Sequence, residues 1–370
     1  MSHQDLLNLT YYRGRVAMYS ILKALGVGRG DEVMTQAFTC VAVPEGILAT
    51  GATPVYVDVE PNGYNLDPED LPQKISARTK AIVVQHTFGI PAQMPKIMRI
   101  ADEYGIPVIE DCCHTLDTEI HGQRVGTFGV AAFYSYEWGK PIVAGIGGSA
   151  RVNDLELRKA LQAELDSFHT PGLSSRVKLA IQYQIHNILY RPSLYWPLKS
   201  LFHSLSKLKL AKGNYNPIGT DQEVAEDFSL CMAPAQKKRL AAKLKNGAEA
   251  YAAHSTRLVE RLRSGLMDVS GIQLPEFDPD TRPVLARLPI RVEDKQRTIS
   301  EAKRQNIELA EWYSTPIHPI PSTQGQAICF EPEMCAHAEN RTREVVSLPL
   351  HHRVTDQYVD KVIDFFQKAA

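Results

Sequence analysis

The sequence predicts an α/β fold in which a mostly parallel sheet is covered by helices on both faces. Helix-like and strand-like stretches alternate at short intervals over residues 15–155. The strands are apolar without the in-and-out alternation of a half-solvated sheet, which is typical of strands buried on both faces. The 370 residues suffice for one large domain and a smaller one.

The expected elements follow one another closely in the first half of the chain. Helical spacing of apolar residues predicts a helix over 16–25, ended by Gly26 and Gly30. After it we expect strand 32–38, helix 41–49, strand 53–59, helix 68–75, strand 80–85, helix 91–104 and strand 106–110. Because ligands collect at the carboxyl ends of such strands, His86, Asp111 and residues 135–140 are the polar positions to examine. His86 is interpreted as structural.

Residues 171–215 differ from the rest of the chain in composition. They are rich in aliphatic and aromatic residues, contain no Asp or Glu, and carry seven cations: Arg176, Lys178, Arg191, Lys199, Lys207, Lys209 and Lys212. Three interpretations stay open for this insertion. It is a helical pair that packs on a dimer or covers the mouth of an active site, a contact with an anionic lipid surface, or a cationic entrance for a diphosphate-bearing substrate.

A long helical pattern over 233–266 and a C-terminal helix over 358–367 complete the expected elements. The change of character near residue 235 predicts a large domain over 1–235, which includes the insertion, and a small C-terminal domain over 236–370.

Composition excludes several classes of protein. A net charge of −1 gives no support for nucleic-acid binding. Six cysteines are too few and too scattered for a secreted disulfide framework, and neither a signal peptide nor a long apolar run is visible, so we expect a cytoplasmic protein. The cluster of Cys329, Cys335 and His337 lacks the spacing of a metal site, and no metal is expected.

The residues with the most telling chemistry follow two of the predicted strands. Asp111 ends an apolar strand, Ser135 precedes Lys140 by five residues, and Gly147 and Gly148 follow. These are parts needed to hold pyridoxal phosphate (PLP), in which a lysine amine forms a Schiff base and a carboxylate pairs with the ring nitrogen. On residue type alone, a structural salt bridge or a solvated lysine is the better explanation of Asp111 and Lys140, because strand-end sites do not specify their ligand.

A series of short motifs makes the interpretation more specific. In chain order they are Gly30-Asp-Glu-Val33, Phe38-Thr39, Gly51 to Asp58, Thr79 to Ile82, His86-Thr-Phe-Gly89, Val108 to Asp111, Gly122 to Gly126, and Lys140 with Gly147-Gly148. This series resembles the DegT-type (DegT/DnrJ/StrS) sugar aminotransferases, which are PLP-dependent enzymes of fold type I with the aspartate aminotransferase architecture. The resemblance continues more faintly near residues 232–236, 312–318 and 348–350.

The resemblance implies a role for each matching residue around the cofactor. Lys140 is the Schiff-base lysine and Asp111 the partner of the ring nitrogen. His114 lies where the family places a Gln or His near the phenolic oxygen. Ser135 binds the phosphate together with the backbone of Gly14 and Arg15.

The resemblance also implies partners. It predicts a homodimer with active sites between the subunits, in which Ser229 takes the place of an Asn that reaches the neighbouring site. His318 is a candidate substrate contact. The implied reaction moves an amino group from a donor such as glutamate to a keto-sugar, usually nucleotide-linked, in polysaccharide, lipopolysaccharide or glycosylated-metabolite biosynthesis.

Departures from the family pattern leave alternatives open. Arg13 and Arg15 flank Gly14 where relatives have hydroxyl residues, so guanidinium groups are possible phosphate ligands. Cys40 stands at an often aromatic position, which leaves open whether Phe38 covers the cofactor ring. A PLP-dependent sugar dehydratase is one alternative, although such relatives carry His in place of Lys140. A catalytically silent scaffold that docks at a membrane through residues 171–215 is another.

Overall fold

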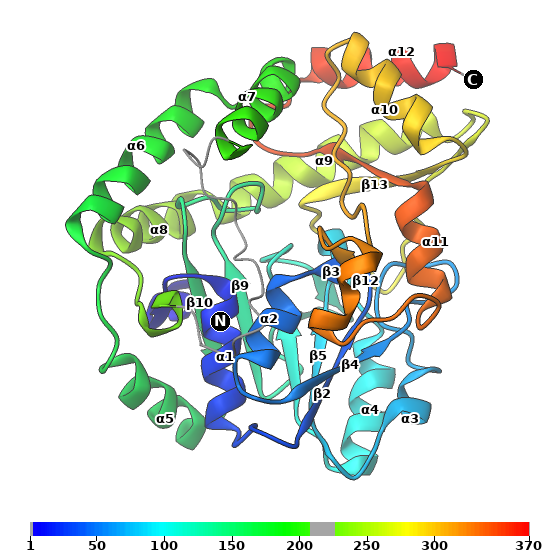
Figure 1. Ribbon diagram of the computed structural model, residues 1–370. Helices are drawn as coiled ribbons and strands as arrows, with labels where there is room; N and C mark the ends of the chain where they lie inside the picture. The colour runs from blue at the N-terminus through cyan, green and yellow to red at the C-terminus, as the bar shows by residue number, and fades with distance from the viewer. Residues whose placement is uncertain (1–2, 208–225, 370) are drawn as a thin grey trace.

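A seven-stranded, mostly parallel sheet forms the centre of the protein (Figure 1). The computed structural model describes residues 3–207 and 226–369. The strand order is β1–β10–β9–β6–β5–β2–β4, with β9, β6, β5, β2 and β4 parallel. The strands are β1 (Leu9–Tyr11), β2 (Glu32–Gln36), β4 (Thr53–Val57), β5 (Thr79–Gln85), β6 (Val108–Asp111), β9 (Ala131–Ser135) and β10 (Gly148–Val152). The predicted fold class is confirmed.

Helices cover both faces of this sheet. One face carries α1 (Gly14–Ala24), α2 (Ala42–Leu48) and α5 (Leu155–Leu165), and the other carries α3 (Leu71–Lys74), α4 (Met94–Tyr104) and α8 (Pro234–Asn246). Strand β5 shows why both faces must be covered. Ala81 and Val83 pack in the apolar cluster on the α1 face of the sheet, whereas Ile82 and Val84 pack in the cluster on the α4 face. Since side chains alternate along a strand, a continuously apolar strand needs two cores.

A second, three-stranded antiparallel sheet organises the C-terminal part. Its order is β11 (Ile272–Gln273), β13 (Arg287–Val292) and β15 (Val345–Pro349). It packs with α9 (Ala248–Leu266), α10 (Lys295–Arg304) and α12 (Asp356–Ala369). The long helical pattern over 233–266 is two helices, α8 and α9, which meet at Gly247. Leu240 packs with the large sheet and Leu258 with the small one, so packing changes near Gly247, and the boundary at 235 stays a prediction.

Several short elements connect the two sheets. β14 (Ile317–His318) pairs in parallel with β3 (Thr39–Cys40), and β12 (Thr281–Arg282) pairs with β7 (Glu119–Ile120), which also pairs with β8 (Gln123–Arg124). Helix α11 (Ala336–Glu344) and the 3-10 helices at 3–7, 87–89, 192–194, 226–229 and 322–328 complete the described elements. The pairing of β14 with β3 brings residues near 318 to the edge of the large sheet where its parallel strands end.

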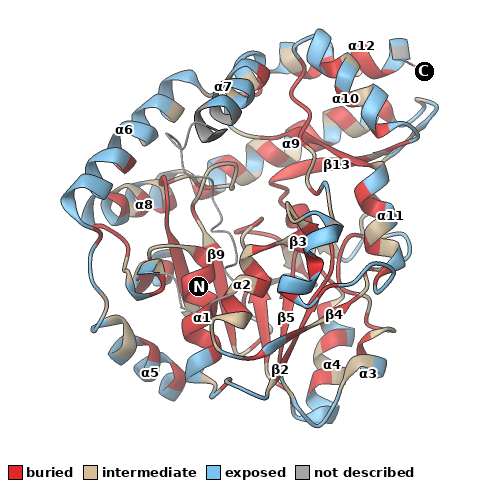
Figure 2. Cartoon of the chain, in the orientation of Figure 1, coloured by how far each residue is buried: buried red, intermediate tan, exposed pale blue. Residues whose placement is uncertain are grey.

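The insertion is a helical pair along one side of the molecule, α6 (Leu173–Leu189) and α7 (Tyr195–Lys207). Trp196 of α7 is buried in the small-domain cluster, whereas α6 is exposed along most of its length (Figure 2). Lys209 and Lys212 lie outside the described residues. Among helices within 3–207 and 226–369, none has the combined length and apolarity that a membrane span requires.

Candidate active site

Lys140 and Asp111 come from neighbouring parallel strands of the large sheet. Asp111 is the last residue of β6 and is in register with Phe133 of β9, and β9 ends at Ser135. Lys140 lies in the loop that leads from β9 back to β10. The positive charge of Lys140 acts on Asp111 and favours the ionised carboxylate. The structure therefore brings Asp111, Ser135 and Lys140 to the same edge of the sheet.

Asp111 is a buried carboxylate with little charge compensation. It is 4% exposed, and its Oδ1 accepts a hydrogen bond of 2.9 Å from the backbone N–H of Cys113. Burial raises the pKa of Asp111, while the bonds from Cys113 and the charge of Lys140 oppose the rise. Within the described residues it makes no salt bridge, so a cationic ring N–H is the kind of partner that such a buried acid needs.

His114 lies in the same region as a neutral, tightly packed ring. Its Nδ1 accepts a hydrogen bond of 3.1 Å from the backbone N–H of Phe88, which leaves the ring proton on Nε2. Burial and the nearby charge of Lys140 hold its pKa well below the usual value. Trp312 stacks on His114 at 5.3 Å and 19°, and the Tyr313 hydroxyl lies 3.5 Å from Nε2. His114 can therefore donate one hydrogen bond but carries no charge.

An anion site is built where α1 begins. Gly14 is the first residue of α1, and the side chain of Arg13 does not cap the helix. A Cβ at Gly14 would lie 3.1 Å from both Ser135 Cβ and the Tyr134 carbonyl oxygen, and one at Gly148 would lie 2.4 Å from the Gly14 nitrogen. These glycines let the uncapped N–H groups approach Ser135 closely. Uncapped N–H groups and a hydroxyl suit a phosphate.

The two arginines beside Gly14 face carboxylates. Arg13 pairs with Glu137 at 2.7 Å and Asp227 at 3.0 Å. Arg15, nearly fully buried, pairs with Glu45 at 2.7 Å and Asp227 at 2.7 Å. What the structure offers an anion at Arg15 is thus the backbone N–H rather than the guanidinium. The interpretation that guanidinium groups bind phosphate gains no support from these contacts.

Two further predicted site residues, Phe38 and His318, are held by contacts of their own. Phe38 is fully buried in an aromatic cluster and meets Tyr313 edge-on at 5.1 Å. His318 pairs in register with Cys40, and its Nδ1 accepts a hydrogen bond of 2.9 Å from the Ser314 hydroxyl. Burial, with the charge of Lys295 adding to it, lowers the pKa of His318 to about 4.

Ser229 stands apart from the others. It is exposed, its hydroxyl donates to the carbonyl of Glu226 at 3.0 Å, and its carbonyl accepts from the backbone N–H of His169. The bridge between Tyr11 and Cys231 places this segment beside β1 at the edge of the sheet. Within one chain, Ser229 is not gathered with Lys140 and Asp111, and its role toward a neighbouring subunit stays a prediction.

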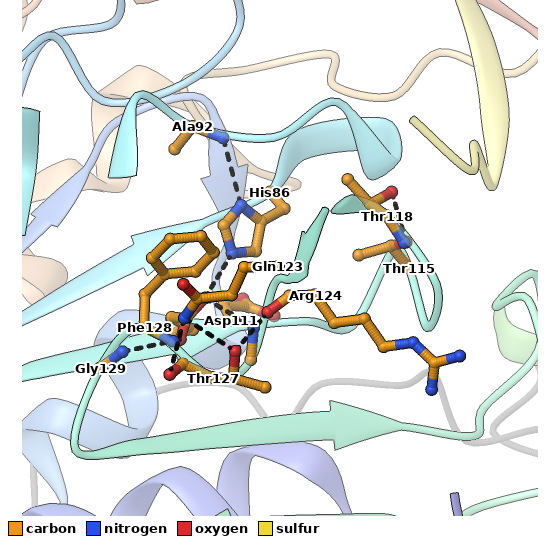
Figure 3. Close-up of polar contacts among 12 residues, drawn as sticks. His86, Ala92, Asp111, Thr115, Thr118, Gln123, Arg124, Thr127, Phe128 and Gly129 are labelled. Atoms are coloured by element: carbon orange, nitrogen blue, oxygen red, sulfur yellow. Dashed lines mark hydrogen bonds and ion pairs between the residues drawn. The ribbon is translucent and has the colours of Figure 1, made fainter. Parts of the chain in front are cut away.

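His86 has the partners of a structural residue. Its Nδ1 accepts a hydrogen bond from the backbone N–H of Ala92 (Figure 3). Its Nε2 lies 3.2 Å from Glu110. Glu110 also accepts hydrogen bonds from the backbone N–H groups of Gly126, Phe128 and Gly129, which ties the end of β6 to the turn between β8 and β9. With Cys112, His86 and Glu110 form a buried group of metal-ligating types, but backbone donors already occupy the carboxylate.

A cavity of about 380 Å³ opens beside Lys140. Helix α6 contributes Tyr183, His186 and Asn187, and Tyr190 follows its C-terminus. Lys243 of α8, His254 of α9, and His352 and Arg353 after β15 complete the polar lining named here. Among the described lining residues none is acidic. His186 Nε2 and Arg353 Nη1 are buried and have no hydrogen-bond partner among residues 3–207 and 226–369. The cavity therefore favours an anionic ligand with acceptor oxygens.

Three features of the site were missed by reasoning from sequence. Trp312 has its ring 5.3 Å from Lys140 Nζ, Glu137 pairs with Arg13, and the cavity joins residues far apart in the chain. Trp312 and Tyr313 stand in a family-like stretch, so their position in that motif was the one signal that could have indicated them. Apart from Lys140, the named residues of the cavity belong to none of the motifs quoted from the sequence.

Comparison with known proteins decides the family. The model of the DegT/DnrJ/EryC1/StrS aminotransferase family matches residues 8–188 and 238–367. The chain belongs to this family. The DegT-type resemblance and the aminotransferase class predicted from sequence are therefore confirmed.

Curated relatives of the chain include sugar aminotransferases. It is 41% identical to the UDP-N-acetyl-3-dehydro-α-D-glucosamine 3-aminotransferase of Acidithiobacillus ferrooxidans over 40% of this chain and 41% of that protein. It is 27% identical to the UDP-2-acetamido-2-deoxy-3-oxo-D-glucuronate aminotransferase of Pseudomonas aeruginosa over 91% of this chain and 79% of that protein. The chain thus spans about two fifths of the first relative and four fifths of the second.

Solved structures of the DegT family share the fold. The PLP form of a candidate sugar aminotransferase from Streptococcus pneumoniae has a TM-score of 0.76 and 20% identity, covering 97% of this chain and 86% of that chain. At this identity the likeness supports the α/β fold alone.

Proposed function

We propose that this protein is a PLP-dependent aminotransferase that transfers an amino group, with glutamate as donor, to a nucleotide-linked keto-sugar. The observation that carries the proposal is the placement of Lys140 and the buried, unpaired Asp111 at one edge of the sheet, next to the uncapped start of α1. Relatives named as nucleotide-sugar aminotransferases support the acceptor class. A role in the biosynthesis of polysaccharides or other glycans follows from that class.

The residues present fit PLP. Lys140 would hold it through its amine, Asp111 would pair with the ring nitrogen, and Ser135 with the N–H groups of Gly14 and Arg15 would receive the phosphate. When bound, PLP supplies an electron-accepting ring that carries the amino group between donor and acceptor. His114 Nε2–H is the donor available to the ring's phenolic oxygen. In the part of the chain that the structure describes, Asp111 makes no ion pair and no side chain caps the start of α1. PLP would provide a partner for both.

Lys140 has a second role once an amino donor has displaced it. Its free amine then moves a proton at the α-carbon of the donor, which a positioned general base accelerates by about 10²–10⁴-fold. Trp312, whose ring lies 5.3 Å from Lys140 Nζ, helps to exclude water from that amine. A histidine at this position could not form the covalent bond, so Lys140 favours transamination over sugar dehydration.

The acceptor would enter through the cavity beside Lys140. Its lining includes Lys243 and Arg353, and no acid among the described lining residues opposes an anion. Burial, with repulsion from the charges of Arg353 and His351, lowers the pKa of His186 to about 4. A phosphorylated acceptor would relieve this repulsion, which supports the entrance role expected for the insertion.

The active enzyme is proposed to be a homodimer in which Ser229 faces the site of the partner subunit. The exposed position of Ser229 at the sheet edge supports such a contact. The six cysteines are free, which supports the cytoplasmic location expected from the sequence.

Replacing Lys140 by Ala tests the assignment. We expect Lys140→Ala to bind PLP without a borohydride-reducible bond and to lose at least about 10³-fold in the transamination rate. The measurements are the visible absorption band before and after borohydride, and its bleaching by glutamate.

Lys159→Ala is the matched control, because Lys159 is an exposed lysine on α5. Glutamate-driven bleaching that survives in Lys140→Ala would refute the role of Lys140. Wild-type protein that never binds PLP would instead support the silent scaffold, and PLP binding without bleaching would support the dehydratase.

A further inference from the structure

The outer face of α6 is mostly apolar, with Ser174 and Gln184 as its polar members, and has no partner within the described chain. Five aliphatic residues share it: Leu173 is 72% exposed, Val177 49%, Ile181 55%, Ile185 50% and Ile188 64%. At about 100° per residue, these positions fall within roughly 120° of one helical face. Scattered exposed apolar residues are ordinary, but a continuous apolar stripe marks an interaction surface.

The opposite face of α6 already holds the helix to the protein. Leu179, Tyr183 and His186 lie roughly 170° from the apolar stripe. Leu179 is buried, Tyr183 lies under the guanidinium of Arg239 at 4.2 Å, and His186 packs on Trp138 at 4.6 Å. The outer stripe therefore contributes nothing to the attachment of α6, and it stays in water unless something else covers it (Figure 2).

Two further exposed aliphatic residues follow α6 in the chain. Leu194 is 38% exposed and Leu201 of α7 is 55% exposed. The family model matches up to residue 188 and resumes at 238, so these two residues lie outside the matched family sequence. The aromatic residues expected at a lipid surface are not part of it, because Trp196 is buried and Tyr183 faces Arg239.

Charge distinguishes between the possible occupants of this surface. Exposed Arg176, Lys178 and Arg191 flank the stripe, and residues 171–207 contain no Asp or Glu. In a symmetric dimer formed through this face, the Arg and Lys side chains of the two copies would lie close together, and this segment has no carboxylate to pair with them. A bilayer with anionic headgroups complements both the apolar stripe and its basic border.

We propose that the outer face of α6 docks the enzyme onto an anionic lipid bilayer. The aliphatic stripe enters the headgroup–acyl boundary, while Arg176, Lys178 and Arg191 meet lipid phosphates. This proposal goes beyond the proposed function and does not depend on it, because binding is measured without turnover.

Vesicle sedimentation of the full chain tests the proposal. We expect the protein to sediment with phosphatidylglycerol-containing vesicles and much less with pure phosphatidylcholine vesicles. The double variant Ile181→Gln/Ile185→Gln should lower the partition coefficient at least about tenfold, since two buried aliphatic side chains are lost. Arg176→Gln/Lys178→Gln should lower binding to anionic vesicles about tenfold and reduce its salt dependence.

Leu155→Gln is the matched control, because Leu155 on α5 is 62% exposed and lies outside the stripe. Its partitioning should equal that of the wild type. Equal sedimentation with neutral and anionic vesicles, or unchanged binding by the isoleucine variant, would overturn the proposal. A change in oligomer size by that variant without any change in lipid binding would also overturn it and assign the face to a second copy.

Discussion

At the scale of single residues, Trp312 resolves a question raised by Cys40. The family often has an aromatic residue at the position of Cys40, and a thiol cannot stack on a cofactor ring. Trp312 lies parallel to His114 and against Lys140 Nζ, each at 5.3 Å. Phe38, the other aromatic candidate, is fully buried and meets the neighbours of His114, Tyr313 and Phe88, edge-on. We infer that Trp312 covers the ring of PLP.

Removing the Trp312 ring should therefore weaken PLP binding. We expect Trp312→Ala to raise the Kd for PLP by about threefold to tenfold, since aromatic stacking contributes about 0.5–1.5 kcal/mol. Trp312→Phe keeps a ring and should stay close to the wild type. Equilibrium dialysis of PLP against each protein measures this directly. Equal Kd values for Trp312→Ala and the wild type would remove Trp312 from the site.

Trp312 also shows why part of the site could not be predicted from sequence. Asp111, Ser135 and Lys140 follow strands whose apolar character is visible locally, and parallel strands must end at one edge. The contact of Trp312 with His114 joins positions about two hundred residues apart, and no local pattern encodes such a contact. The packing of Trp196 into the small domain could not be predicted either, because its partners are also distant in the chain.

At the scale of elements, a buried ion pair ties β13 to the segment between α10 and β14. Arg287 Nη1 donates to Glu308 Oε1 at 2.9 Å, Arg287 also donates to Ser347, and His351 lies 3.3 Å from Glu308. Burial alone would raise the pKa of Glu308, but the charge of Arg287 and the bond from His351 outweigh it and lower that pKa to about 2. Arg287 borders the Lys140 cavity, so this pair also fixes one wall of it.

Breaking this pair should destabilise the protein strongly. We expect Glu308→Gln to lower the free energy of unfolding at neutral pH by about 3–5 kcal/mol, because it leaves Arg287 buried without a counter-charge. Glu308 makes its full contribution to the free energy of unfolding above its unfolded pKa of 4.5, and this contribution is lost as the pH falls toward about 2. The wild type should therefore lose stability between these pH values, and the variant should lose less. Urea unfolding between pH 7 and 3 measures both effects.

An exposed ion pair provides the control. Arg261 Nη2 lies 2.5 Å from Asp360 Oδ1 at the surface between α9 and α12. Asp360→Asn should cost less than about 1 kcal/mol, since solvent screens such pairs. Equal losses for Asp360→Asn and Glu308→Gln would contradict the account of Glu308.

At the scale of the whole molecule, the arrangement of layers follows from the sequence, but the division between domains does not. Continuous apolar strands require helices on both faces, and alternation of elements supplies them in order. The break at Gly247 inside the predicted helix 233–266 depends on which sheet each half packs against. Leu240 and Leu258 are both leucines of the same predicted helix, but they pack in different hydrophobic cores, which the sequence does not reveal.

Assembly into a dimer is the prediction that belongs to this scale. We expect analytical ultracentrifugation to give twice the mass of one chain, since Ser229 is exposed at the edge of the sheet. Ser229→Trp should perturb PLP-linked absorption by crowding the partner's site, whereas Ser193→Trp, at an exposed serine of the insertion, should not. A monomer with full activity would contradict the shared site.

Helix α6 has one further consequence, because its two faces belong to different environments. Tyr183 and His186 line the cavity, and the aliphatic stripe faces outward from the same rigid 17-residue segment. A shift of α6 that favours a ligand on one side alters the free energy of contact on the other, and thermodynamic linkage makes that coupling reciprocal. If attachment to the surface raises the affinity for the ligand by some factor, the bound ligand raises the affinity for the surface by the same factor.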